Sequence, residues 1–534
     1  MPYTARAGLA AALLGLVLGC LALGPALGWG FTLLQDMVFV PEPEFSRFTF
    51  GLAGGAARVV PSDAVVTALA YVLPAELVQK LILLGIFVLG CSGAALLVPS
   101  GSLGPRLVAG AFYVWNPYVA ERLLIGQWAL LLGYAGLPWV VRAVWSRRRV
   151  VAAMVPAAVG GFAAMTVTAI TALPVAALSV PSGAGPDARP GARLAALPRR
   201  RVVVWVAVVL GMFSLPWLVP TALRPYGIEG DPAGVDAFAA RADTPFGAVG
   251  SLLSLGGIWN AYAVPPGYES VVGVVARLAL TLAGVVAFLR ADVPYKRGLA
   301  VAAGIGLGVA CVGVSGPGRE AFKQVVGLWG GFAVFRDAQQ YVAPLALAAA
   351  VGLGLLAEHV ARRRVWVAAL ALVPVAVLPT MAWGSLGRLG SVSYPQSWTA
   401  AREVIARDPA PGDVLVLPFE SYRRFPWNGG RAVLDPAQRF FAVAGRRVVS
   451  NDAVRVGDLV VGSEDPRAQA VEHVLQEPSP NLPGAGFLYV IVDAGTGEER
   501  ERFAGWLRAA RLVVEGDDLR LYRFDGPVAG VSPQ

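Results

Sequence analysis

The sequence is poor in charged residues, cysteine and histidine, and each shortage excludes a class of protein or site. Only 15% of its 534 residues are charged, whereas an average soluble domain has about 25%. The three cysteines, Cys20, Cys91 and Cys311, lie in apolar segments, so the soluble part has no disulfide and no Cys-based metal motif. The two histidines, His359 and His473, are far apart and leave little material for a zinc site or a Ser–His–Asp triad.

Apolar residues are abundant instead, at 56% of the chain, with a mean hydropathy of +0.61. About 20 consecutive apolar residues are enough to cross a membrane. The apolar segments are 8–30, 78–98, 106–125, 128–146, 150–180, 202–222, 271–290, 299–315, 341–360 and 365–384. We therefore expect a transmembrane helical domain over residues 1–384 and a soluble α/β domain over residues 385–534.

The net charge of +9 is explained by the membrane and does not call for a nucleic acid partner. Arginine gathers in short connections between apolar segments: 147–149, 199–201, 290 with 296–297, and 362–364. Such basic connections face the cytoplasm in membrane proteins.

The segment 150–180 has basic residues at both ends, so both ends should be cytoplasmic. A single span cannot do this, and Gly160-Gly161 offers a break within the segment. We therefore expect a tight pair of short or re-entrant helices, buried in protein. About eleven crossings follow, with a cytoplasmic N-terminus and an extracytoplasmic C-terminal domain in the cell's inner (plasma) membrane. Loops 31–77, 223–270 and 316–340 then lie outside.

The C-terminal domain alternates helix and strand patterns. The near-continuous apolar runs Asp413–Phe419 and Phe487–Asp493 are typical of buried parallel strands. An amphipathic helix is expected over Ser397–Arg407 and a second helix over Glu498–Ala510. A hairpin turn is expected at Glu515–Asp518, between two short strands.

The first outside loop carries the leading candidate for a catalytic residue. Asp36 lies about six residues beyond the first apolar segment, where a carboxylate at the membrane boundary can be partly desolvated and act as a general base. A solvated loop acid is the plainer alternative. The length of the loop favours function, because long loops in compact proteins are usually functional or disordered. Arg58 and Lys80 follow as candidates for binding a donor phosphate or an acceptor.

Two further charged clusters lie at the predicted outer boundary. In the first, WNPYVAERLLIGQW, Pro117 breaks a helix and leaves carbonyls to be satisfied, and Glu121, Arg122 and Gln127 follow. Charges at this depth are rare and often functional, so these three residues, with Arg336 and Asp337 below, are candidates for binding the donor phosphate or the acceptor. An internal ion pair that only holds helices together is the alternative.

In the second boundary cluster, Arg336 and Asp337 come just before the apolar segment 341–360. The planar guanidinium of arginine suits a lipid phosphate, because it can bind phosphate oxygens in pairs. An interfacial anchor against lipid headgroups is the plainer interpretation.

The sequence resembles the GT-C glycosyltransferases, and in particular polytopic actinobacterial arabinofuranosyltransferases and mannosyltransferases. The resemblance rests on Gln35-Asp36-Met37, on Trp115–Trp128 and on Phe335–Tyr341 (FRDAQQY), together with many helices and a C-terminal extracytoplasmic domain. It implies a GT-C-like fold and assigns the carboxylate role of the first loop to Asp36. Many family members carry a paired acidic motif here, whereas Asp36 is followed by Met37.

The resemblance also implies a function. Such enzymes move a sugar from a polyprenyl-phosphate donor to a cell-envelope glycan, a lipid or a protein, among membrane lipids. No cofactor is certain, and the family allows a divalent cation, magnesium or manganese, with unknown ligands. Two alternatives stay open: a transporter or flippase of lipid-linked glycans, and a non-catalytic scaffold for cell-envelope assembly.

Overall fold

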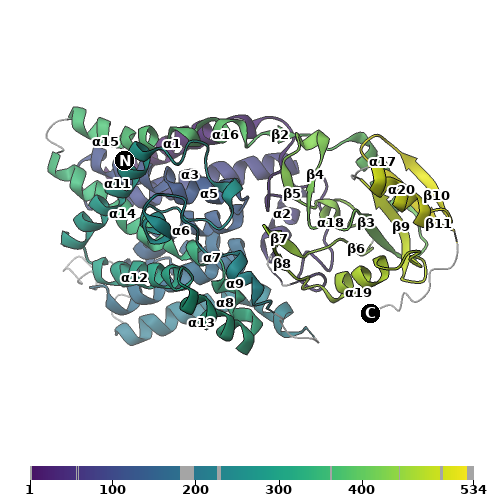
Figure 1. Cartoon of the computed structure of the whole chain (residues 1–534). Helices are drawn as coiled ribbons and strands as arrows, with labels where there is room; N and C mark the ends of the chain where they lie inside the picture. The colour runs from purple at the N-terminus through teal and green to yellow at the C-terminus, as the bar shows by residue number, and fades with distance from the viewer. Residues whose placement is uncertain are drawn as a thin grey trace. The chain divides into compact units, whose positions relative to one another are not determined.

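The chain divides into two compact units, and Figure 1 shows its helices and strands. The computed structural model describes residues 3–55, 57, 59–180, 198–224, 230–360, 364–443, 445–493 and 497–525. The first unit comprises Met1–Pro25, Lys80–Val219 and Gly230–Leu389, and the second comprises Ala26–Gln79, Pro220–Glu229 and Gly390–Gln534. The first loop of the sequence therefore belongs to the same unit as the C-terminal residues.

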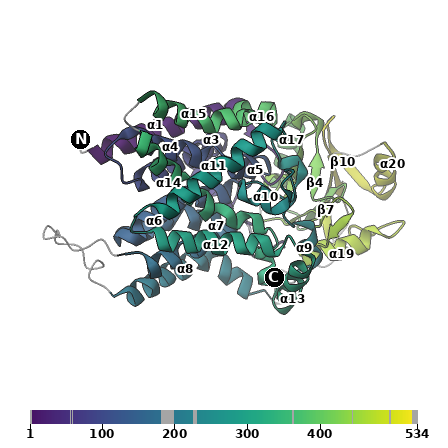
Figure 2. The same cartoon turned by 60° about the vertical axis from the view of Figure 1, so that its left-hand side comes forward.

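The first unit is helical, and α6, α7 and α12 lie side by side in both views (Figures 1 and 2). Its helices are α1 (Tyr3–Leu23), α3 (Ala75–Leu97), α4 (Leu103–Val114), α5 (Pro117–Leu124), α6 (Trp128–Ser146), α7 (Val150–Leu178), α8 (Arg199–Ala222), α9 (Ala233–Ala237), α10 (Gly247–Leu253), α11 (Val271–Arg290), α12 (Lys296–Val312), α13 (Gly316–Leu328), α14 (Ala343–Val360), α15 (Arg364–Val377) and α16 (Ala382–Gly387). Short 3-10 turns are η1 (Gly24–Leu27), η2 (Ala261–Ala263), η3 (Gly330–Phe335), η4 (Ala338–Val342) and η5 (Pro379–Met381). Helix α3 begins in residues of the second unit, and η1 and α8 end in residues of that unit.

By length and composition, seven helices in the described residues can cross a membrane, and two bent pairs raise the number to nine. The bent pairs are α12 with α13, at 98°, and residues 370–377 of α15 with Pro379–Gly387, at 73°. The chain is mostly helical, with a small sheet region near its C-terminal end. The prediction of a multi-pass membrane architecture is thereby confirmed, whereas eleven crossings and their orientation stay predictions.

Helix α7 is broken where the sequence predicted a break. Gly161 has φ 75° and ψ −151°, a conformation that only glycine adopts readily. A Cβ added to Gly133 on α6 would lie 3.6 Å from the Cα of Ala157 and 3.2 Å from that of Ala164. Seven residues of straight helix span about 10 Å, so these two residues cannot both lie so near one point unless the chain bends sharply between them.

Both ends of α7 lie close to the connection between α11 and α12. The N–H of Val180, just after α7, donates to the carbonyl of Pro294 at 2.9 Å. Trp145, just before α7, contacts the ring of Tyr295 at a centroid distance of 5.9 Å, and the Tyr295 hydroxyl donates to the Leu97 carbonyl at 2.7 Å. The two ends of α7 therefore lie near the same connection, as expected if the segment is a pair of short helices that turns back on itself.

Asn116 satisfies the carbonyls that Pro117 frees between α4 and α5. Its side-chain amide donates to the carbonyls of Phe112 and Tyr113, each at 2.9 Å, and its Oδ1 accepts from the Val119 N–H at 3.1 Å. One asparagine thus completes the end of α4 and caps the start of α5. The predicted 106–125 segment is therefore two helices joined by a corner that Asn116 stabilises.

Glycines bring helices of the first unit into backbone contact. A Cβ at Gly306 on α12 would collide with the carbonyl oxygen of Tyr341, and a Cβ at Gly284 on α11 would collide with that of Ala349 on α14. Small residues at helix crossings allow the close approach that stabilises helix pairs in membranes.

The second unit is an α/β arrangement. Its strands are β1 (Phe31–Thr32), β2 (Ser391–Val392), β3 (Asp413–Leu417), β4 (Tyr422–Arg424), β5 (Ala432–Leu434), β6 (Val448–Val449), β7 (Val454–Val456), β8 (Leu459–Val461), β9 (Phe487–Val492), β10 (Ala510–Glu515) and β11 (Arg520–Phe524). Its helices are α2 (Ser62–Ala70), α17 (Gln396–Arg407), α18 (Ala437–Phe440), α19 (Pro466–Leu475) and α20 (Gly497–Trp506), with the 3-10 turn η6 (Pro426–Asn428).

The main sheet has the strand order β10-β11-β9-β3-β6. Strands β3 and β9, the two predicted buried strands, pair in parallel, and Leu415 lies opposite Val490. The predicted hairpin is also present, since β10 and β11 pair antiparallel around Glu515 and Arg520. The predicted helix to Ala510 is too long: α20 ends at Trp506, because Ala510 already pairs with Phe524 in the sheet.

The small sheets connect the first loop to the C-terminal residues. Strands β1 and β2 pair antiparallel, with Phe31 opposite Val392, although the two residues are far apart in the sequence. Strands β4 and β5 form an antiparallel pair of their own, as do β7 and β8. Backbone hydrogen bonds thus attach the loop that follows α1 to the C-terminal residues of this unit.

We predict that Gly306→Ala destabilises the protein while Gly304→Ala does not. Both glycines lie on α12, but a Cβ at Gly306 meets the Tyr341 carbonyl and a Cβ at Gly304 meets nothing within 4 Å. Overpacking costs about 1–3 kcal/mol, whereas alanine in an open helical position stabilises by about 0.5–1 kcal/mol. Thermal unfolding of both variants in detergent measures the difference. Equal melting temperatures would contradict the close packing.

Candidate functional site

Asp36 lies at the tip of a tight turn over Leu34–Met37. The Met37 N–H donates to the Leu34 carbonyl at 2.8 Å, and the Leu34 N–H donates to the Met37 carbonyl at 3.3 Å. Gln35 has φ 48°, in the left-handed region. A non-glycine residue in a sparsely populated region costs on the order of 1–3 kcal/mol and persists only where its surroundings hold it. Such backbone strain clusters at functional sites.

Strand β5 supplies what holds this turn. The Gln35 N–H donates to the Ala432 carbonyl at 2.7 Å, and the Gln35 carbonyl accepts from the Leu434 N–H at 2.8 Å. Asn428 adds a side-chain bond to the carbonyl of Leu33 at 3.3 Å. The position of the Asp36 backbone is therefore fixed by the C-terminal part of the chain.

The side chain of Asp36 is also engaged from this region. The hydroxyl of Tyr422, on β4, donates to Asp36 Oδ1, and both side chains are half-buried. Sequence reasoning missed Tyr422, because 386 positions separate the two residues and β4 is only three residues long.

Arg423 follows Tyr422 on β4 and is buried among acids. Its guanidinium donates to Asp493 at 2.5 Å and to the Pro418 carbonyl at 2.9 Å, and it lies 3.9 Å from Asp435. Burial raises the pKa of Asp493 to about 7; Arg423 opposes this shift and Asp435 adds to it. Asp493 directly follows the parallel strand β9. A polar residue at the carboxyl end of a parallel strand is the signal that could have singled it out.

Arg122 is the centre of a buried network in the first unit. Its side chain is fully buried and binds Asp337 through two nitrogens, at 2.6 and 3.0 Å. The amide oxygens of Gln127 and Gln339 also accept from it. Its guanidinium lies 5.7 Å from the ring of Tyr118. The structure therefore brings together three predicted site residues, Arg122, Gln127 and Asp337. They bind one another instead of facing an open site.

Glu121, the neighbour of Arg122, shares Gln339 with this network and also lies near Gly256. Gln339 donates to Glu121 Oε2 at 3.4 Å. A Cβ at Gly256 would meet Glu121 Oε1 and Asp243 Oδ2, each at 2.9 Å, and the Tyr268 hydroxyl closer still. Among the described residues, Glu121 Oε1, Asp243 Oδ1 and the Tyr268 hydroxyl have no hydrogen-bond partner. Gly256 therefore lies between the two carboxyl groups and the Tyr268 hydroxyl, where a larger side chain does not fit.

The remaining predicted residues are placed separately. Lys80 lies on α3 and is 9% exposed. Arg336 stacks on Phe238, with its guanidinium carbon 4.7 Å from the ring centroid. Arg58 lies outside the described residues. A role for any of them in binding phosphate stays a prediction.

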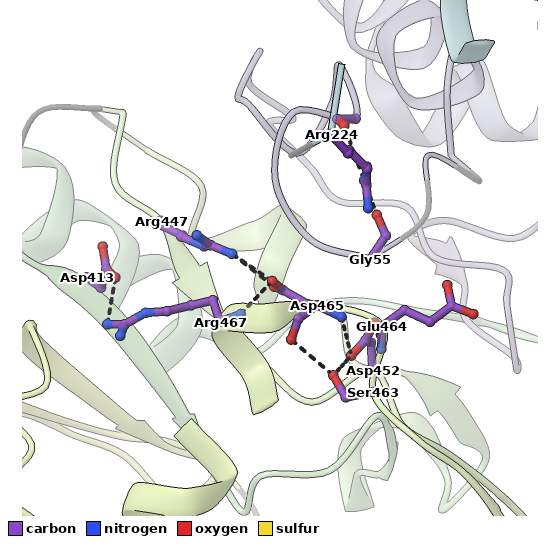
Figure 3. A network of polar contacts seen from close by, with 10 residues as sticks. Gly55, Arg224, Asp413, Arg447, Asp452, Ser463, Glu464, Asp465 and Arg467 are labelled. Atoms are coloured by element: carbon purple, nitrogen blue, oxygen red, sulfur yellow. Dashed lines mark hydrogen bonds and ion pairs between the residues drawn. The ribbon is translucent and has the colours of Figure 1, made fainter. Parts of the chain in front are cut away.

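A further charged network surrounds the start of α19 (Figure 3). Asp465 caps this helix by accepting from the Arg467 N–H at 3.0 Å, and its carboxylate accepts from Arg447 at 2.9 Å. Arg467 donates to Asp413 at the start of β3, also at 3.0 Å. These acids hold a helix to the sheet. Across the described part of the chain, no group of three or more His, Cys, Asp or Glu is placed to hold a metal ion.

Among solved structures, the chain is similar to the crystal structure of the Archaeoglobus fulgidus oligosaccharyltransferase in complex with zinc and sulfate. The match has 13% sequence identity and a TM-score of 0.41, and it covers 93% of this chain and 69% of that chain. No protein-family model matches the sequence, and no curated protein matches it. A likeness this distant assigns no activity to the chain.

We predict that Arg122→Leu destabilises the protein strongly. The substitution leaves Asp337 without its cation, and breaking a buried ion pair costs about 3–5 kcal/mol. Arg319→Leu is the control, because its pair with Asp236 is about one-third exposed and Lys323 also binds that carboxylate. Thermal unfolding in detergent compares the variants. If Arg122 instead served to bind a donor phosphate, its loss would weaken donor binding and leave the melting temperature unchanged.

We predict that Asp493 makes stability fall as pH rises. Because burial raises the pKa of Asp493 to about 7, the folded chain holds a proton that the unfolded chain releases near pH 4. The folded state binds more protons between these values, so its stability declines by on the order of 1 kcal/mol per pH unit from about pH 4 to about pH 7. Melting temperatures of native protein and Asp493→Asn over this range measure the effect. A difference between the two that does not vary with pH would argue against it.

Proposed function

We propose that the chain is a membrane glycosyltransferase that uses a polyprenyl-phosphate sugar donor. The acceptor is a hydroxyl group of a cell-envelope glycan, lipid or protein on the outer face of the plasma membrane. Asp36 is the general base of the transfer. The N-terminus is cytoplasmic, and the second unit is extracytoplasmic.

The observation that supports this proposal best is the construction around Asp36. The carboxylate follows the first candidate span, Thr4–Leu27, by nine residues. It sits beside a left-handed Gln35, in a turn that is bonded on both sides to β5. A solvated loop acid needs no such support, whereas a base must be held within hydrogen-bonding reach of the proton it removes.

The proposed reaction is a single displacement with inversion at the sugar. Asp36 takes the proton of the acceptor hydroxyl, and the acceptor oxygen forms a bond to the anomeric carbon. The bond from that carbon to the phosphate oxygen breaks, and polyprenyl phosphate leaves with the electron pair. A cationic side chain stabilises the leaving phosphate. Lys80, Arg336 and Arg58 are the candidates for that role.

The contacts of Arg122 favour a different role for this residue. Its donors already bind Asp337 and two glutamine side chains, so a phosphate would have to displace a buried ion pair. We therefore assign Arg122 to the scaffold that joins α5 to η4.

We predict that Asp36→Asn lowers transfer by at least about 100-fold, the scale of a lost general base. The chain is purified in detergent and supplied with polyprenyl-phosphate mannose and, separately, polyprenyl-phosphate arabinofuranose, with cell-envelope glycan as acceptor. Transfer of radiolabelled sugar is measured. The asparagine keeps the shape of the side chain, so membrane insertion and melting temperature should change little.

Asp63→Asn is the matched control. Asp63 lies in the same loop and also bonds a residue of the C-terminal part, since Arg439 donates to it at 2.8 Å. This variant should retain transfer within a few-fold. Full activity of Asp36→Asn would refute the assignment of the base. Donor binding without transfer by the native chain would favour the scaffold alternative.

A further inference from the structure

The hydroxyl of Tyr422 occupies one oxygen of the proposed base. It donates to Asp36 Oδ1 from strand β4 of the second unit. A carboxylate has two oxygens, and each can accept from more than one donor. A donor fixed on Oδ1 therefore restricts the orientation of the whole carboxylate.

The backbone fixes this contact from both sides. Tyr422 pairs with Leu434 in the β4–β5 ladder, and the Leu434 N–H donates to the Gln35 carbonyl at 2.8 Å. Gln35 directly precedes Asp36. The β4–β5 pairing and the bond from Leu434 to Gln35 thus set the positions of the hydroxyl and the carboxylate relative to each other.

The other face of β4 is fixed by charge. Successive residues of a strand point to opposite faces, so Arg423 points away from Asp36 when Tyr422 points toward it. Arg423 is 2% exposed and is bound by Asp493, with Asp435 at 3.9 Å. Reversing the faces of β4 would leave these two buried carboxyl groups without Arg423, which is strongly unfavourable. The orientation of Tyr422 is therefore strongly specified.

We propose that Tyr422 is a positioning residue of the transfer site, which holds the Asp36 carboxylate through Oδ1 in the orientation in which it receives the acceptor proton. This inference rests on the proposed function. Tyr422 keeps its own proton throughout, so the atom balance of the reaction is unchanged. The consequence is that the C-terminal part of the chain contributes to catalysis through this hydroxyl.

Two effects distinguish this role from a structural one. A hydrogen bond to an ionised carboxylate favours the ionised form, so removing it makes the base take up a proton at higher pH. The acid limb of the pH–rate profile of Tyr422→Phe should therefore move to higher pH. The loss should appear in kcat, by about 10- to 100-fold, with KM nearly unchanged, because hydrogen bonds to charged groups have this strength.

The experiment compares Tyr422→Phe with native protein and with Tyr394→Phe, using the polyprenyl-phosphate mannose and arabinofuranose donors. Tyr394 is the matched control, because its hydroxyl donates to a backbone carbonyl of the same loop, that of Phe39, at 2.9 Å. We expect Tyr394→Phe to keep the native pH profile and kcat within about twofold. Native kcat and pH profile in Tyr422→Phe would overturn the inference.

Two further outcomes keep the inference and the proposed function separable. If Asp36→Asn is inactive while Tyr422→Phe behaves as native, only the role of Tyr422 fails. If Asp36→Asn is fully active, the proposed function fails first. Should Tyr422→Phe fold poorly, 3-fluorotyrosine at position 422 keeps the ring and hydroxyl but strengthens the donor. The acid limb should then move to lower pH, and an unmoved limb would overturn the role.

Discussion

Two backbone hydrogen bonds between Gln35 and strand β5 are the constraint on which the second unit depends. They join a loop from the start of the chain to a hairpin near its end, across about 400 residues. They also hold Gln35 in a left-handed conformation that a non-glycine residue does not adopt without support. Because Asp36 is the next residue, the same two bonds decide where its carboxylate stands.

This constraint changes the role that can be expected of the C-terminal domain. From the sequence, that domain could bind a glycan or a partner and leave the chemistry to the membrane helices. In the structure, the first loop supplies β1 to a sheet with β2 and a turn to the edge of β5. Loop and domain form a single unit, and a variant that weakens the β4–β5 hairpin changes the surroundings of Asp36 as well.

The features that could be predicted from the sequence are local ones. Apolar runs of membrane length predict the candidate membrane-spanning helices, and shorter continuous apolar runs predict the parallel strands β3 and β9. A break in 150–180 is predictable because the basic residues at both ends require one and Gly160-Gly161 permits it; the structure has it at Gly161. Pro117 predicts a break in the helix that leaves carbonyl groups without partners, and the side chain of its neighbour Asn116 donates to two of them.

The features that could not be predicted are pairings between distant residues. Arg122 and Asp337 were both singled out, but 215 positions separate them, and nothing in the sequence shows that they bind each other. The contact between Tyr422 and Asp36 is more distant still, and a three-residue strand has too few residues for a periodicity. Long-range partners follow from topology, which local patterns do not determine.

Two of the buried arginines, Arg122 and Arg423, show how the chain uses charge to specify orientation. Arg122 is fully buried in the first unit and Arg423 is 2% exposed in the second, and each binds an acid from a distant segment. An apolar replacement of such a pair can be as stable, so stability alone does not explain it.

For Arg423, the alternation of side chains along strand β4 explains why a buried ion pair is useful. A slip of one residue would exchange the faces of β4, burying Tyr422 and exposing Arg423. Because Asp435 and Asp493 stabilise only the arrangement with Arg423 inside, they also direct the Tyr422 hydroxyl toward Asp36.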